Sequence, residues 1–215
     1  MPEFIKTAST RLAFERHYRR IFERRLPHGV TYFYCLGGVS FFLFLVLTFT
    51  GIVLSLYYVP SASEAYGSIR FIDEKLPTGW LMRSMHIWAA SGMVAAVLAH
   101  MIRVYVTGSY KNPREFNWVV GMILFVVTMI FGFSGYLLPW DQKAYWATTV
   151  GTAMPGTTPV IGDFLVRIIR GGADVTGITL LRFYVLHVYV LPLLTMLLLW
   201  AHFHMIRRQG ISGGL

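Results

Sequence analysis

Four histidines in two apolar stretches are spaced in a way that could hold two cofactors. His86 and His100 are fourteen residues apart in one stretch, and His187 and His202 are fifteen apart in another. In an α-helix, fourteen residues return to within roughly 40° of the same direction about 21 Å further along, and fifteen to within roughly 60° after about 22 Å. Each pair therefore occupies one face of its helix at two depths.

Facing imidazoles from two helices are the axial ligands that a six-coordinate haem iron requires. If both helices run in the same direction, His86 faces His187 at one level and His100 faces His202 at the other, and we expect two haem b groups. A structural zinc site normally takes four ligands, and a proton relay needs closer spacing. His204 is about 160° around the helix from His202, so it is not expected to bind either haem. Without a cofactor, the same histidines would be polar interior groups of a transporter or scaffold.

The elements that must carry these histidines are membrane-spanning helices. The chain is 55% hydrophobic and only 13% charged, with a mean hydropathy of +0.56, which excludes an ordinary soluble domain. Four stretches without Asp, Glu, Lys or Arg are long enough to cross a bilayer. They are Leu26–Ser63, Ser84–Ile102, Phe116–Trp140 and Phe183–Ile206. We predict an all-α membrane protein, a single domain over 1–215, in which a four-transmembrane-helix bundle at about 32–57, 79–106, 115–138 and 179–207 encloses the two haems.

The distribution of basic residues predicts how the helices are oriented. The net charge of +9 comes from bases outside the apolar stretches, as is typical of membrane flanks, so we expect no nucleic-acid partner. Twelve bases lie in the N-terminal segment, the connection between the second and third helices, and the C-terminus; seven lie on the opposite side with six acids. By the positive-inside rule both termini are cytoplasmic. The second and fourth helices then run inward, which places His86 and His187 at the outer level.

Two further segments are predicted to lie on the membrane surface. Residues 1–29 predict an amphipathic surface helix, with basic residues on one side and an apolar face of Phe14, Tyr18, Ile21 and Phe22. Between the third and fourth helices we expect short surface helices. Thr158-Pro159 could begin one and Gly171-Gly172 would end it. Its apolar face would consist of Ile161, Leu165, Ile168 and Ile169.

Four glycines match the spacing of the histidines. Gly37 and Gly51 lie in the first helix and Gly121 and Gly135 in the third, each pair fourteen residues apart. A glycine surface without Cβ lets a wedged porphyrin and its neighbouring helices approach closely. The helix directions place Gly37 and Gly121 at the inner level and the other two at the outer level. Pro192 should bend the fourth helix, and we hypothesise that this bend accommodates the one-residue difference between the histidine spacings.

The single cysteine, Cys35, limits the kinds of site that the chain can form. It excludes an internal disulfide framework and a multi-cysteine zinc or iron–sulfur site. From its residue type alone, Cys35 is either a small buried hydrophobe or a single attachment point.

Several segments of the sequence match a known family. They are Phe33-Tyr34-Cys35-Leu36-Gly37-Gly38, Arg83-Ser84-Met85-His86, His100-Met101-Ile102-Arg103-Val104-Tyr105, Lys111-Asn112-Pro113-Arg114-Glu115, Gly135-Tyr136-Leu137-Leu138-Pro139-Trp140-Asp141-Gln142 and the tail from Met205 to Gly213. With these segments the chain resembles the cytochrome b6 family, the four-helix half of the split cytochrome b in b6f-type quinol oxidoreductases. The fifteen residues from His187 to His202 are also typical of the b6 branch.

This resemblance implies three haems. His86 and His187 would bind an outer, low-potential haem b, and His100 and His202 an inner, higher-potential one. Cys35 would form a thioether to a third, c-type haem on the inner side, at the quinone-reducing site. Haem propionates prefer arginine partners. The residues suited to them are Arg83 for the outer haem and Arg103, Arg114 and Arg207 for the inner group.

The resemblance also implies an activity and partners. Quinol would be oxidised at the outer side, in a pocket with Tyr136, Pro139 and Trp140 as candidate residues. Electrons would pass through both b haems to a quinone at the inner side, coupled to proton translocation. The Pro-Glu-Trp-Tyr motif of the family is absent from this chain, so a subunit IV-like second half of cytochrome b should complete the quinol site. A Rieske iron–sulfur protein, a c-type cytochrome and a dimeric complex are also implied.

One departure from the family bears on the host membrane. Ile87 follows His86 where photosynthetic members typically carry Arg. Together with the unusual N-terminal segment, it favours a bacterial plasma membrane, with a thylakoid membrane as the alternative. A second function remains open: a di-haem b membrane anchor of another respiratory oxidoreductase would share the histidine ladder, but would need neither the surroundings of Cys35 nor a quinol pocket shared with a partner.

Overall fold

A computed structural model describes residues 30–212, and the expected N-terminal surface helix over 1–29 lies outside this range. Within it, four apolar helical segments are long enough to cross a membrane. The first consists of the 3₁₀ turn η1 (Tyr32–Cys35) and α3 (Leu36–Ser55), the second is α5 (Gly79–Val106), and the third is α6 (Glu115–Leu137). The fourth is continuous through α9 (Gly177–Val185), a π-helical turn, η3 (Leu186–Val190), and α10 (Leu191–Gln209). The predicted four-helix membrane bundle is confirmed.

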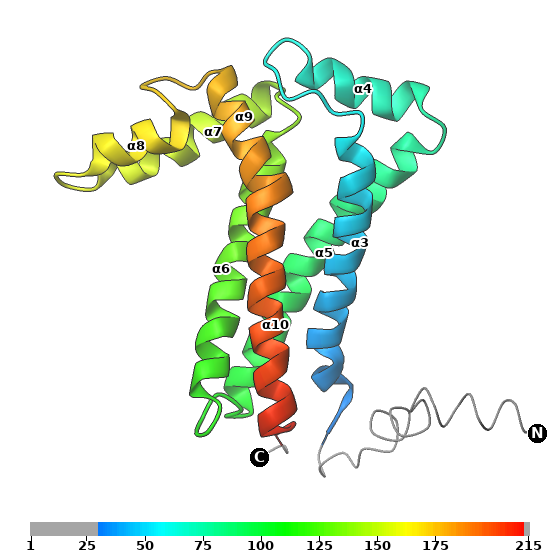
Figure 1. Cartoon of the computed structure of the whole chain (residues 1–215), viewed down its shortest axis with the longest axis vertical. Helices are drawn as coiled ribbons and strands as arrows, with labels where there is room; N and C mark the ends of the chain where they lie inside the picture. The colour runs from blue at the N-terminus through cyan, green and yellow to red at the C-terminus, as the bar shows by residue number, and fades with distance from the viewer. Residues whose placement is uncertain (1–29, 213–215) are drawn as a thin grey trace, which may run out of the picture.

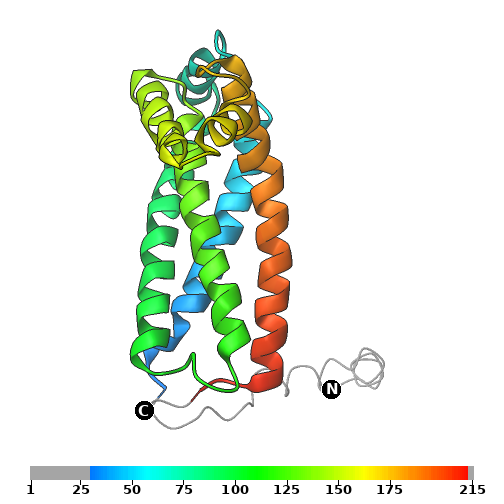
Figure 2. The same ribbon diagram turned by 90° about the vertical axis from the view of Figure 1, so that its left-hand side faces the viewer.

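The four long helices lie side by side, and the shorter helices gather at one end (Figures 1 and 2). We call this end, with α4 (Ala65–Lys75), α7 (Gln142–Ala153) and α8 (Gly162–Arg170), the capped end. The opposite end holds the start of α3, the connection between α5 and α6 and the end of α10, and we call it the terminal end. α5 and α10 both run from the capped end to the terminal end, as the ladder of histidines requires.

The helices form because apolar residues occupy nearly every face, which suits segments that contact lipid on one side and one another on the other. In α3 only Phe44 and Thr50 are buried, while Phe42 and Phe49 are exposed on the outside of the chain. α3 packs mainly against α5, and α6 against α10. This pairing brings each glycine-bearing helix against one that carries histidines.

α4 follows the first membrane helix and is an element that the apolar pattern of the sequence does not predict. It packs through Ala65, Ser68 and Ile72. α5 can begin directly beneath it because Gly79 has no side chain: a Cβ there would lie 1.9 Å from the carbonyl oxygen of Ile72. An ion pair of 2.7 Å between Asp73 of α4 and Arg83 of α5 adds to this contact.

The connection between α6 and α9 is helical, as predicted. The Asp141 carboxylate caps α7 by accepting a hydrogen bond from the Ala144 amide at 2.8 Å. α8 begins at Gly162, later than the expected Thr158-Pro159, because Met154–Thr157 forms a separate 3₁₀ turn, η2. Gly171 ends α8 as predicted, with a left-handed φ of +82°.

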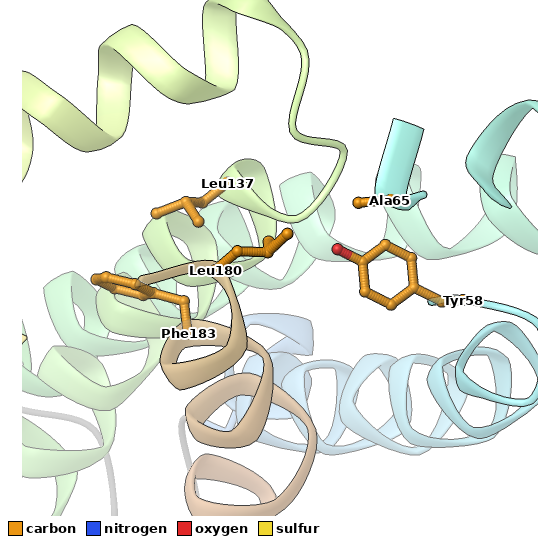
Figure 3. Close-up of a cluster of buried hydrophobic side chains, with 5 residues drawn as sticks. All are labelled: Tyr58, Ala65, Leu137, Leu180 and Phe183. Carbon is orange, nitrogen blue, oxygen red and sulfur yellow. The ribbon is translucent and has the colours of Figure 1, made fainter. Parts of the chain in front are cut away.

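A small core closes the capped end of the bundle. It contains Tyr58, Ala65, Leu137, Leu180 and Phe183 (Figure 3). The Tyr58 hydroxyl donates to the Leu138 carbonyl oxygen at 2.6 Å, which is one of the carbonyls that the end of α6 leaves free of helical partners. The segment after α3 is thereby tied to the end of α6.

Candidate functional site

His86 and His187 face each other between α5 and the fourth membrane helix. Their ring centres are 6.4 Å apart, with 62° between the ring planes. We take the iron–imidazole bond to have about the length of the zinc–imidazole bond, about 2.0–2.1 Å. Two such bonds on opposite sides of one iron, with each ring centre roughly 1.1 Å behind its nitrogen, place the ring centres roughly 6–6.5 Å apart. The distance between the two rings therefore fits a shared haem iron.

Each ring of this pair is held at Nδ1 by a buried hydroxyl. The Thr50 Oγ1 atom lies 2.8 Å from His86 Nδ1, and the Ser134 Oγ atom lies 2.9 Å from His187 Nδ1. With Nδ1 engaged in this way, Nε2 is the ring nitrogen left for a metal. Sequence reasoning missed both hydroxyl residues. A signal was present, because each directly precedes one of the outer-level glycines, Gly51 and Gly135.

The four predicted glycines each lie against one of the four histidines. A Cβ added at Gly51 would be 3.3 Å from His86 Cε1, and one at Gly135 would be 2.7 Å from His187 Cε1. At the terminal end, the corresponding distances are 3.1 Å from Gly37 to His100 Cε1 and 3.7 Å from Gly121 to His202 Cε1. The levels are those expected from the helix directions. At Gly37, Gly51 and Gly135 the immediate reason for glycine is the histidine ring itself, since a methyl group would press on it, whereas at Gly121 a methyl group would lie at ordinary contact distance.

The π-helical turn explains how the fourth helix fits a fifteen-residue spacing. His187 is the second residue of η3, where the Leu191 amide donates to the Leu186 carbonyl oxygen five residues back. Such a turn contains one residue more than an α-helical turn. The fifteen residues from His187 to His202 therefore turn the chain through about the same angle as the fourteen residues from His86 to His100 in α5. The additional residue thus lies in a turn that ends at Val190, two residues before Pro192, which has no amide hydrogen to donate.

The terminal end gathers buried polar atoms that have no hydrogen-bond partner among residues 30–212. They are Tyr34 Oη, Arg103 Nε, Arg114 Nε, Asn117 Oδ1, His202 Nδ1 and Gln209 Oε1. Arg103 also lies 4.5 Å over the ring of Tyr34. Buried polar groups are normally paired. Two guanidinium groups with free donors fit an anionic group, such as a haem propionate, at this end.

The other predicted arginines are placed differently. Arg83, expected to face the outer haem, is paired with Asp73, a partner that sequence reasoning did not identify. Arg207 is exposed at the end of α10. Cys35 is an exposed free thiol at the terminal end, directly before α3, so the alternative of a small buried hydrophobe is wrong.

The candidate quinol-pocket residues lie at the capped end, where α6 ends. Tyr136 is 56% exposed, while Pro139 and Trp140 are half-buried. Trp140 adopts a left-handed φ of +52°, a strained conformation for a bulky residue. Its ring packs edge-on against Tyr145 of α7 at 5.9 Å. The three residues therefore share one region, although only Tyr136 projects freely from it.

His204 does not join either pair. It is exposed on α10 and stacks on Trp200 at 5.7 Å. In the described part of the chain, no three or more His, Cys, Asp or Glu side chains lie close enough to hold a metal ion together.

A bundle of four membrane helices with paired histidines at two levels defines the class of di-haem membrane cytochromes. A family model described as Cytochrome b/b6/petB matches residues 21–210. Cytochrome b6 from Tupiella akineta and from Gloeobacter violaceus are each 49% identical over 195 residues, which is 91% of this chain and 91% of theirs. That from Chlamydomonas reinhardtii is 48% identical over the same shares. The chain belongs to the cytochrome b/b6 family.

A solved structure has the same fold. A chain of a hyperthermophilic respiratory Complex III superposes with a TM-score of 0.91 at 32% identity, over 97% of this chain. This chain spans 56% of the length of that one. The resemblance inferred from the sequence is confirmed.

Proposed function

We propose that this chain is the haem-carrying subunit of a b6f/bc-type quinol oxidoreductase, in which electrons from quinol at the outer side reach a quinone site at the inner side and protons are translocated. The observation that carries the proposal is the His86–His187 pair at 6.4 Å, with His100 and His202 each against its glycine one level below. When bound there, haem supplies one-electron transfer. The cytochrome b6 relatives and the Complex III neighbour support the same function.

The side chains of this protein would hold the haems, orient the ligand rings and exclude water. Four histidines supply Nε2 atoms, and four glycines let each ring lie against the next helix. Thr50 and Ser134 fix the rings of the capped-end pair. At the terminal end, Arg103 and Arg114 have donors for anionic groups. The apolar faces of the helices keep water and ions from the space between the levels.

Cys35 is proposed to attach a c-type haem. Its thiol is exposed at the terminal end, the end at which Arg103, Arg114 and the other unpaired polar atoms gather. An exposed cysteine in that position can form a thioether without displacing the core. The same end is then the quinone-reducing side.

The quinol site is proposed at the capped end and is incomplete in this chain. Tyr136, Pro139 and Trp140 supply one side, and a subunit with the Pro-Glu-Trp-Tyr motif would supply the rest. An iron–sulfur protein and a c-type cytochrome would accept the electron that does not cross the membrane. We place the terminal end, with both chain termini, on the cytoplasmic side of a bacterial plasma membrane, because basic residues concentrate there.

Haem analysis of single histidine variants tests the proposal. The purified complex should give a reduced-minus-oxidised spectrum and a pyridine haemochrome with about two b haems per chain, and each of His86, His100, His187 and His202 changed to alanine should remove or weaken one. His204→Ala is the matched control, since this histidine is exposed on the same helix as His202. Absence of haem from the purified wild-type complex, or haem loss confined to His204→Ala, would refute it. Two b haems without covalent haem would point instead to the di-haem b membrane anchor.

A further inference from the structure

The two histidine pairs differ in what holds their Nδ1 atoms. In the capped-end pair, each Nδ1 meets a hydroxyl, from Thr50 at 2.8 Å and from Ser134 at 2.9 Å. Both hydroxyl residues are fully buried, at 0% exposure. A buried hydroxyl of this kind is a fixed partner that water does not replace.

The direction of these hydrogen bonds follows from the other contacts of the two hydroxyls. Thr50 Oγ1 donates its proton to the Val46 carbonyl oxygen at 2.8 Å, and Ser134 Oγ donates to the Phe131 carbonyl oxygen at 3.2 Å. A hydroxyl has one proton, so towards histidine each oxygen must accept. His86 and His187 therefore carry their proton on Nδ1 and present the Nε2 lone pair.

The terminal-end pair has different partners. His100 Nδ1 lies 3.5 Å from Arg103 Nη2, and a guanidinium has only donors, so it cannot accept a proton from this ring. His202 Nδ1 is buried and meets no hydroxyl in residues 30–212. The sequence repeats the contrast: Leu36 and Val120 precede the terminal-end glycines, where Thr50 and Ser134 precede the capped-end ones.

We propose that Thr50 and Ser134 are positioning residues that hold the capped-end ligands in the Nε2-coordinating tautomer and lower the reduction potential of the iron between them. The inference rests on the proposed function, since it assumes an iron at that level. A histidine that donates from Nδ1 to an oxygen is a stronger electron donor to its metal, and this favours the ferric state. A cation beside the ligand, such as Arg103 beside His100, favours the ferrous state. These contacts give a physical cause for the lower potential that the family resemblance implies for the outer haem.

Potentiometric titration of the purified complex, followed by haem absorbance, tests this inference. Thr50→Val and Ser134→Ala should each raise the reduced-to-oxidised ratio of the capped-end haem at a fixed potential by about threefold to tenfold, where tenfold equals 59 mV for one electron. The terminal-end haem should stay unchanged. Thr50→Ser keeps a hydroxyl and should titrate as the wild type does. The His86→Ala chain identifies which transition belongs to which level.

Thr128→Val is the matched control. Thr128 is also buried in a membrane helix and also donates to a carbonyl four residues back, that of Leu124 at 2.8 Å, but its hydroxyl makes no hydrogen bond to a histidine in the described structure. An unchanged capped-end potential in both test variants would overturn the inference, as would an equal shift of both haems or a shift in Thr128→Val. If Thr50→Val lost its haem, Ser134→Ala would decide alone. A wild-type complex without haem would instead refute the proposed function.

Discussion

The space beside each histidine ring is set by a single glycine. Gly135 is the most constrained of the four, because its missing Cβ would lie only 2.7 Å from His187 Cε1. The ring cannot retreat freely, since Phe131 packs edge-on against it at 5.4 Å and the Ser134 hydroxyl holds its Nδ1 atom. A side chain at position 135 must therefore move the ligand itself.

We predict that Gly135→Ala displaces His187 and reduces the b-haem content of the purified complex by up to about half, with the terminal-end haem retained. Pyridine haemochrome analysis against protein concentration measures this. Gly132→Ala is the control, because a Cβ there meets nothing within 4 Å on the same helix. Alanine is the better helix former, so this control should keep full haem content. Full content and an unshifted spectrum in Gly135→Ala would contradict the prediction.

The sequence predicts the ligands and their glycines but not the atoms that orient the rings. Histidine and glycine stand out in an apolar helix, and their spacing of fourteen or fifteen residues links them. Thr50 and Ser134 do not stand out, since Ser and Thr are ordinary in membrane helices, where they bond to a carbonyl of the preceding turn. Asp73 was missed for another reason: its partner Arg83 is ten residues away, beyond any helical spacing.

At the scale of elements, the apolar runs predict that four membrane helices exist, but they miss several helix ends, as with the run Leu26–Ser63 against the observed Tyr32–Ser55. α4 is different because its buried face consists of Ala65, Ser68 and Ile72, one of which is polar and one small, so its periodicity is faint. The π-helical turn is likewise invisible in composition. The fifteen-residue spacing of the histidines in this helix, against fourteen in α5, is the trace that it leaves in the sequence.

The junction between the first membrane helix and α6 depends on the Tyr58 phenol. Its hydroxyl donates to the Leu138 carbonyl oxygen at 2.6 Å, and its ring stacks on Tyr184 at 5.5 Å. Burial, with a smaller contribution from Tyr184, raises the pKa of Tyr58 above its ordinary value of 10.0. The phenol therefore stays protonated and able to donate throughout the neutral range.

We predict that the thermal stability contributed by this junction falls at alkaline pH. Because the folded pKa is raised, the stability that the phenol contributes is fully present below about pH 10 and is lost as pH rises further. Tyr58→Phe should lower the thermal midpoint at pH 7, by the loss of a hydrogen bond of about 0.5–1.5 kcal/mol. The thermal midpoint of Tyr58→Phe should also decline less than that of the wild type above about pH 10. Tyr57→Phe, on the exposed neighbour, controls for general tyrosine ionisation. An identical alkaline decline in Tyr58→Phe and wild type would contradict the prediction.

At the scale of the whole molecule, the capped end exposes apolar side chains next to charged ones. The α8 face exposes Ile161, Phe164 and Ile168, with Phe164 at 64%, beside the ionic groups of Arg167 and Arg170. An exposed apolar face rimmed by charge is typical of a membrane-surface or subunit contact. This agrees with a chain that supplies one part of a larger complex.

The terminal end provides a direct test of orientation, because Cys35 is the only cysteine of the chain and is exposed. A membrane-impermeant maleimide reaches only the thiols on its own side of the bilayer. If the terminal end is cytoplasmic, protein expressed without covalent haem attachment should be labelled in inverted membrane vesicles and not in intact spheroplasts. The positive-inside rule favours this outcome, since the bases concentrate at that end.

A second thiol at the capped end makes this measurement reciprocal. Ser63 is exposed two residues before α4, so Ser63→Cys in a Cys35→Ser background should be labelled in spheroplasts and not in inverted vesicles. Opposite labelling of the two positions fixes an odd number of membrane crossings between them, as α3 alone provides. Labelling of Cys35 from the outer side, with Ser63→Cys reached from the inner side, would reverse the bundle and move the quinol site to the cytoplasm. Covalent haem at Cys35 should abolish labelling of that residue, because thioether formation consumes the thiol.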